Sequence, residues 1–79
     1  MKIKFFAHLQ NVTGCREIEL APPHDATQEA VWEMLCSRFP GLAPHRAATR
    51  LAVNAAYAAP NTVFKDGDEV ALIPPVSGG

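Results

Sequence analysis

One amphipathic segment with strand patterns on both sides limits this chain to very few folds. Residues 28–39 carry apolar side chains at spacings of three and four, which is the period of a helix with one buried face. The members of this stripe are Val31, Met34, Leu35 and Phe39. Thr27 is a suitable N-cap, and Pro40 ends the helix because proline cannot continue the hydrogen-bond ladder. This apolar face of the helix must be buried, and we expect it to pack against a sheet.

Two strand patterns precede the helix. Residues 2–7 alternate, so Ile3 and Phe5 share one face while Phe6 lies on the other. Residues 16–20 alternate again after a connection rich in turn formers that ends in glycine. We expect these two strands to form a hairpin-like pair, which the following prolines terminate.

The strand patterns that follow the helix are less regular. Residues 43–49 are predicted as a loop or a weak turn, because proline and small residues dominate there. Residues 51–54 are typical of a third strand, and residues 55–58 continue it beyond a tight turn near Asn54.

The last strand pattern follows a strong turn signal. Residues 65–69 combine lysine, acidic residues and glycine, and residues 70–73 then read as a strand with Val70 and Leu72 facing the core. Four or five strands covered on one face by one helix make an α+β roll. At 79 residues, the chain is too short for two cores, so we expect a single domain over residues 1–79.

Composition and charge exclude several classes of protein. Seven basic and eight acidic residues give a net charge of −1, and the Lys and Arg are scattered, so nucleic acid is not expected as a partner. Apolar runs fall short of the roughly 20 residues that span a membrane. The N-terminal residues resemble a strand rather than a signal peptide, which favours a cytoplasmic protein. Cys15 and Cys36 are therefore expected to be free thiols.

A catalytic or metal centre cannot be assembled from the sequence. His8, His24 and His45 lack metal-ligand spacing, and the acidic turn at residues 66–69 lacks the calcium-loop pattern. Cys36 and the neighbouring Trp32 are interpreted as packing residues. A free-standing enzyme is therefore the weakest hypothesis.

Three motifs carry a resemblance to a known family. They are Phe5-Phe6-Ala7, the turn and strand start Asp66-Gly67-Asp68-Glu69-Val70-Ala71, and the ending Pro74-Pro75-Val76-Ser77-Gly78-Gly79. Together they resemble the MoaD/ThiS family of β-grasp, ubiquitin-like sulfur carriers, and within it the molybdopterin synthase branch. Gln28 and the stretch 8–12 depart from the commoner family pattern. The resemblance implies a β-grasp roll with a mixed sheet of four or five strands.

The resemblance also implies a function for the C-terminus. An E1-like adenylyltransferase would use ATP to adenylate the Gly79 carboxylate, which is then converted to a thiocarboxylate. Residues 74–79 would be a flexible tail, whose Ser77 and Gly78 thread into the large subunit of molybdopterin synthase and deliver sulfur to a cyclic pterin precursor. The chain would then be a non-catalytic subunit, within a heterodimer or heterotetramer, and would hold no permanent cofactor or metal.

Strand parity adds a docking hypothesis. Phe6 and Ile73 both point away from the helix-covered face, and exposed bulky apolar residues often mark a contact surface. We expect them, with Pro74, Pro75 and Val76, to anchor the large subunit. The alternative is that a loop covers them.

Two other functions stay open at this stage. A sulfur carrier for another pathway, such as thiazole synthesis, shares the fold and the two terminal glycines. A non-covalent β-grasp interaction module would not need those glycines at all.

Overall fold

The computed structural model of the chain describes residues 1–22 and 25–75. The predicted tail residues Val76, Ser77, Gly78 and Gly79 therefore lie outside the described residues. The elements, in chain order, are β1 (Lys2–Phe5), α1 (Leu9–Thr13), β2 (Glu17–Glu19), β3 (Ala26–Thr27), α2 (Gln28–Arg38), the 3₁₀ helix η1 (Pro40–Ala48), β4 (Arg50–Val53), β5 (Ala56–Tyr57), β6 (Val63–Phe64) and β7 (Glu69–Ile73).

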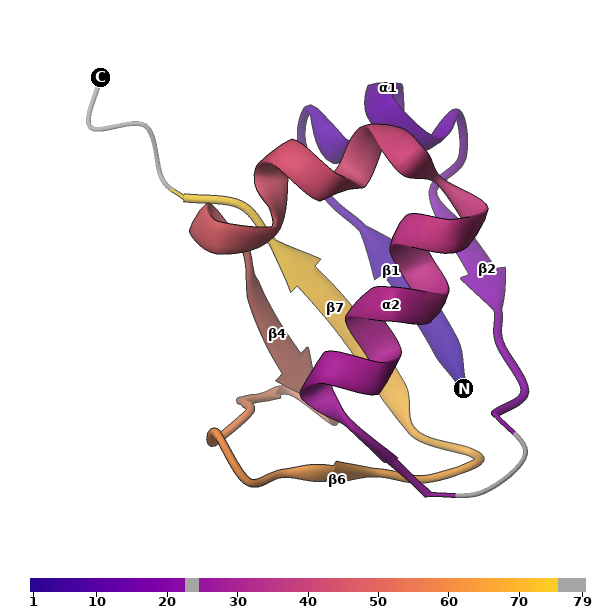
Figure 1. Cartoon of the computed structure of the whole chain (residues 1–79), viewed down its shortest axis with the longest axis vertical. Coiled ribbons are helices and arrows are strands. Elements are labelled where there is room, and N and C mark those ends of the chain that lie inside the picture. Colours follow the sequence, from indigo (N-terminus) through magenta and orange to yellow (C-terminus); the bar gives the residue numbers. More distant parts are fainter. Residues whose placement is uncertain (23–24, 76–79) are drawn as a thin grey trace.

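Five strands form one mixed sheet in the order β2-β1-β7-β4-β5. The central strands β1 and β7 are parallel, and the other pairs are antiparallel. Helix α2 lies across one face, whereas α1 and η1 gather at the end of the sheet toward which β7 points (Figure 1). This is a β-grasp arrangement, so the predicted α+β roll and its opening hairpin are confirmed.

The core lies between the sheet and α2. Ile3 and Phe5 of β1, together with Val70 and Leu72 of β7, are fully buried, as the alternation predicts. The helix contributes Val31, Trp32 and Leu35 to the same core. Trp32 is therefore a packing residue, as expected.

Helix α2 begins and ends close to the predicted residues. The Thr27 hydroxyl accepts a hydrogen bond from the Ala30 N–H at 3.1 Å, which confirms the N-cap. The helix ends at Arg38, one residue before the predicted end, and Phe39 is its C-cap. The side-chain amide of Gln28 donates to the Ala59 carbonyl at 2.7 Å. This polar residue thus ties the helix start to the loop after β5.

The prediction of a strand over residues 2–7 was wrong at its C-terminal end. Strand β1 stops at Phe5, and Ala7 has a φ of 53°, a left-handed conformation that no strand residue adopts. The connection to β2 contains α1, which the sequence did not predict. This helix is short, but it buries Leu9 completely and ends at Gly14, whose φ is 76°.

One further helix and a pair of strands were missed. Residues 43–49, predicted as a loop or a weak turn, belong mostly to η1, which buries Leu42. Strands β3 and β6 form a second sheet of two strands, in which Ala26 pairs with the buried Phe64. The helix and the strand pair are each stabilised by burial of one large side chain against the core rather than by a local pattern.

The turn near Asn54 is confirmed. Asn54 and Ala55 have φ values of 49° and 70°, as a tight hairpin between β4 and β5 requires. The side-chain N–H group of Asn54 donates to the Asp68 carboxylate at 3.1 Å. The side-chain oxygen of Asn54 accepts from the Glu69 backbone N–H at 3.1 Å. The Lys65 N–H also donates to Asp68, and this hydrogen bond holds the pKa of Asp68 below its usual value.

Replacing Leu72 tests the central role of β7. Leu72→Ala should lower the free energy of unfolding by about 2–5 kcal/mol, because the residue is fully buried and its removal leaves a cavity. Urea denaturation followed by circular dichroism measures this loss. Ile73→Ala, at the neighbouring outward position, should cause a markedly smaller loss. Equal losses at the two positions would contradict the assigned sheet faces.

Candidate functional site

The sheet face opposite α2 carries a shallow groove. Strand register aligns Lys4, Ala71, Ala52 and Tyr57 in one row across four strands. The small alanines form the floor, and bulkier side chains stand around it. This space, here called the sheet groove, has a volume of about 410 Å³ and is lined by Lys4, Phe6, Ala52, Ala55, Tyr57, Glu69, Ala71 and Ile73.

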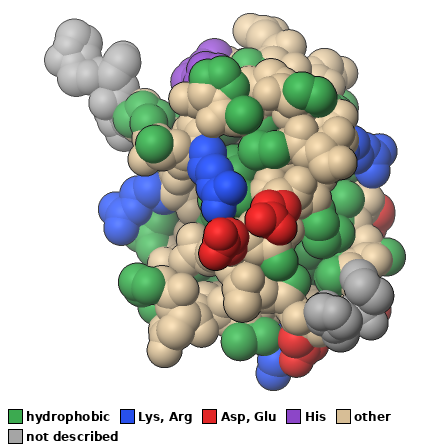
Figure 2. Space-filling model, viewed as in Figure 1, with side chains coloured by type: hydrophobic (Ala, Val, Ile, Leu, Met, Phe, Trp, Pro, Cys, Tyr) green, Lys and Arg blue, Asp and Glu red, His purple; other side chains and the backbone are tan. Residues whose placement is uncertain are grey.

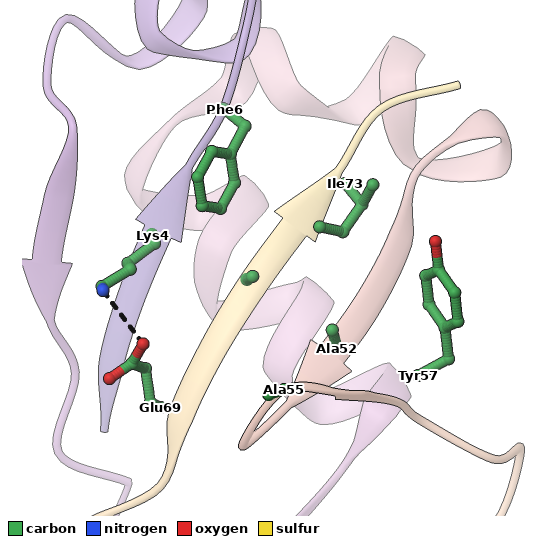
Figure 3. A pocket seen from close by; sticks show the side chains of 8 residues that line it. Lys4, Phe6, Ala52, Ala55, Tyr57, Glu69 and Ile73 are labelled. Atoms are coloured by element: carbon green, nitrogen blue, oxygen red, sulfur yellow. Dashed lines mark ion pairs between the residues drawn. The ribbon is translucent and has the colours of Figure 1, made fainter. Parts of the chain in front are cut away.

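The two predicted anchor residues border this groove. Figure 3 shows Phe6 and Ile73 on the side of the sheet away from the helices, with Phe6 just beyond β1 and Ile73 at the end of β7. Phe6 is 43% exposed, so no loop of the described chain covers it. The structure therefore brings together two apolar residues far apart in sequence. Their role in binding stays a prediction.

The chain leaves the sheet beside the groove. Ile73 is the last residue of β7, and it is followed by the half-buried Pro74 and the exposed Pro75. The chain therefore continues beyond Pro75 from a point next to the apolar surface.

An ion pair closes the other side of the groove. Lys4 Nζ donates to the Glu69 carboxylate at 2.9 Å (Figure 3). This hydrogen bond, helped by the attraction between the two charges, raises the pKa of Lys4 and lowers the pKa of Glu69. The pair places two opposite charges beside an apolar floor and leaves little net charge there.

Sequence reasoning missed the aromatic side of the groove. Tyr57 on β5 is 60% exposed, and the Arg50 guanidinium lies 4.4 Å from the centre of its ring. The alternation after Asn54 was too short to assign a face. The exposed aromatic residue itself was the available signal, since such residues are common in interfaces.

The other groups of reactive side chains are weaker candidates for a functional site. Among the described residues, no three histidine, cysteine or acidic side chains come close enough to hold a metal ion. The rings of His8 and His45 lie 5.1 Å apart between α1 and η1. Cys15 and Cys36 are free and partly buried, and they pack against the core. His24 lies outside the described residues.

The helix-covered face carries mixed charges. Figure 2 shows Asp and Glu side chains next to Lys or Arg in several places on this surface. Over residues 1–22 and 25–75, none of the helices has the length and apolar character needed to span a membrane. The sheet groove thus remains the strongest candidate for a functional surface.

Comparison with known proteins shows which family the chain is similar to. The profile of the ThiS family matches residues 3–79. The chain is 33% identical to a molybdopterin synthase sulfur carrier subunit of Arabidopsis thaliana, over 79 residues that cover 100% of this chain and 82% of the relative.

Two solved structures have the same fold. The small archaeal modifier protein 1 of Haloferax volcanii superimposes with a TM-score of 0.85 and 31% identity, covering 99% of this chain and 97% of the other. A putative subunit 1 of the molybdopterin converting factor from Pyrococcus furiosus gives a TM-score of 0.84 and 29% identity, with 95% of each chain covered.

The ion pair generates a pH prediction. In Lys4→Met the pKa of Glu69 should rise toward its ordinary value of about 4.3, because the hydrogen bond and the charge are both lost. A carboxyl-detected NMR titration measures the change. Since the folded-state pKa lies below the unfolded one, the pair stabilises the fold above the unfolded pKa, and this contribution disappears as the pH falls through the folded pKa.

Lys65→Met is the control for this titration. It removes a lysine near Asp68 and should leave the pKa of Glu69 unchanged. A Glu69 carboxyl that titrates identically in wild type and in Lys4→Met would disprove the pairing.

Proposed function

Because the chain belongs to the ThiS family, we propose that it is the sulfur carrier subunit of a molybdopterin synthase. The observation that supports this most strongly is the similarity to a molybdopterin synthase sulfur carrier subunit over the whole of this chain and 82% of that relative. The sheet groove adds a physical argument, because an exposed apolar surface lies directly beside the point where the chain leaves the sheet. A carrier needs both a reactive end and a surface that positions it.

The proposed chemistry takes place at the Gly79 carboxylate. This group is ionised at neutral pH and is a poor electrophile, so it must be activated. An E1-like adenylyltransferase would let the carboxylate attack the α-phosphorus of ATP, which releases pyrophosphate and forms the acyl-adenylate. A sulfur donor would then displace AMP. The resulting thiocarboxylate would deliver its sulfur to a cyclic pterin precursor.

Glycine suits the end of such a tail. A terminus that enters a narrow channel must bring its backbone close to the channel walls, and a Cβ atom would obstruct this approach. Gly78 and Ser77 would therefore thread, while Val76 stays near the mouth of the channel. The ATP would be bound by the activating partner, so this chain would need no permanent cofactor. Use of ATP also agrees with the proposed cytoplasmic location.

The large subunit of molybdopterin synthase would bind over the sheet groove. Phe6, Ile73, Pro74 and Pro75 would supply the apolar contacts, and the catalytic groups would belong to the large subunit. The small size of the fold supports this division of labour, since a chain of 79 residues has little room for a deep pocket.

A second candidate function follows from the archaeal similarity. A chain that is 31% identical to a small archaeal modifier protein could itself be a protein modifier. The same acyl-adenylate would then react with an amine of another protein instead of sulfur. A carrier for thiazole synthesis and a non-covalent interaction module are the remaining alternatives.

The reaction at Gly79 is tested by mass spectrometry of the intact protein. After incubation with ATP, an E1-like activating enzyme and a sulfur donor, the mass should rise by about 16 Da, because one carboxylate oxygen is replaced by sulfur. Deletion of Gly79 should abolish this gain.

Each other result favours a different function. Conjugates of higher mass without the sulfur gain would favour the modifier. No change with an activating enzyme of proven activity would favour the non-covalent module. A sulfur gain without sulfur transfer to the pterin precursor would favour the thiazole pathway.

The docking surface is tested by Phe6→Asp. This variant should lose binding to the large subunit, since a charge at the rim of the groove cannot be desolvated against an apolar partner. Isothermal titration calorimetry measures the loss. Val63→Asp is the matched control, because Val63 is 48% exposed but does not line the groove. Undiminished affinity in Phe6→Asp would rule out this face.

A further inference from the structure

The place where the chain leaves the sheet also carries an arginine. Arg50 is the first residue of β4, and the antiparallel register places it directly opposite Ile73 of β7. It is exposed. Its charge therefore stands at the end of the sheet groove from which Pro74 and Pro75 continue.

Arg50 is held in place by an aromatic ring. Its guanidinium lies 4.4 Å from the ring centre of Tyr57, which is within the range of a cation–π contact. Tyr57 lines the sheet groove (Figure 3). This contact restricts the guanidinium and uses none of its N–H groups, which stay free to donate. The side chain thus loses less conformational entropy when a partner binds it.

The two cations beside the groove differ in their charge balance. Lys4 is neutralised by Glu69 at 2.9 Å. Among the described residues, by contrast, no carboxylate forms an ion pair with Arg50. Residues 34–65, which include β4 and β5, contain no Asp or Glu. Glu29 and Arg46 line a neighbouring hollow together with Arg50, but no ion pair joins Arg50 to Glu29. The side of the groove next to Pro74 therefore carries an arginine without an ion pair, whereas the lysine on the opposite side is paired.

We propose that Arg50, stacked on Tyr57, binds a carboxylate of the partner protein at the mouth of the channel that receives the tail. This inference rests on the proposed function, in which that partner is the large subunit of molybdopterin synthase. A carboxylate accepts two parallel hydrogen bonds from one guanidinium, so a single exposed arginine is sufficient. Tyrosine and arginine are also the residues that most often dominate binding energy at interfaces.

A protein carboxylate fits this surface better than a small anion. A phosphate site is usually built from several converging donors, often backbone N–H groups. The sheet groove instead offers one arginine beside an apolar floor of alanines, and it is open. Such a surface favours a broad partner with an apolar centre and an acid at its edge.

The test is calorimetric binding of the full chain to the large subunit. Arg50→Gln should weaken binding about 10- to 100-fold, because the partner's carboxylate loses two charge-assisted hydrogen bonds. The affinity of Arg50→Lys should lie between those of wild type and Arg50→Gln, since lysine keeps the charge but cannot form the two parallel hydrogen bonds. Tyr57→Phe should keep the affinity and Tyr57→Ala should lower it, because the ring alone supports the guanidinium.

Two controls separate docking from folding and from general charge. Arg38 lies 5.6 Å over the ring of Phe39 and lines neither the sheet groove nor its rim, so Arg38→Gln should leave the affinity within about twofold of wild type. The salt dependence of binding should also weaken in Arg50→Gln and not in Arg38→Gln. Urea denaturation of Arg50→Gln should match wild type.

The outcomes distinguish this inference from the proposed function. A wild-type chain that binds the large subunit while Arg50→Gln binds equally well would overturn the role of Arg50 and leave the function standing. Equal losses of affinity in Arg50→Gln and Arg38→Gln would also overturn the role of Arg50, because they would reflect the net charge of the chain. A wild-type chain that does not bind the large subunit would contradict both proposals.

Discussion

The parallel pairing of β1 with β7 is the interaction on which the rest of the structure depends. It joins the first and last strands in the register Ile3 with Val70 and Phe5 with Leu72. All four of these side chains are buried beneath α2. Parallel neighbours need a long crossover, and here residues between the two strands supply α2, η1 and the remaining strands. The central pair therefore fixes both the core and the layout of the elements around it.

The same register builds the sheet groove. Side chains alternate along a strand, so burying Phe5 and Leu72 turns Lys4, Ala71 and Ile73 outward. Neighbouring strands add Ala52 and Tyr57, and the result is a low apolar floor with raised edges. One edge carries a compensated ion pair, and the other carries an arginine next to the tail. This asymmetry would give the proposed partner a defined orientation as well as a place to bind.

Local patterns predicted the elements that they control. The alternation of β7, the periodicity of α2 and the cap at Thr27 were found where the sequence indicated, and β1 differs from its prediction only by ending at Phe5. Helices α1 and η1 and the β3–β6 pair were missed. Each is short and depends on burying one residue, such as Leu9 or Leu42, against parts of the chain distant in sequence. A short segment has too little periodicity to reveal such a contact.

The sequence by itself determined the fold class, the faces of Phe6 and Ile73 and the motifs that identify the family. These properties follow from alternation and from fixed motif positions, which are local. The tertiary structure alone decided that Phe6, Ile73 and Tyr57 line one groove and that Arg50 lies over the Tyr57 ring beside it. Their proximity depends on which strands pair and in what register. Those choices are made by the burial of the whole core, because a shift of one residue would turn every side chain of a strand to the other face.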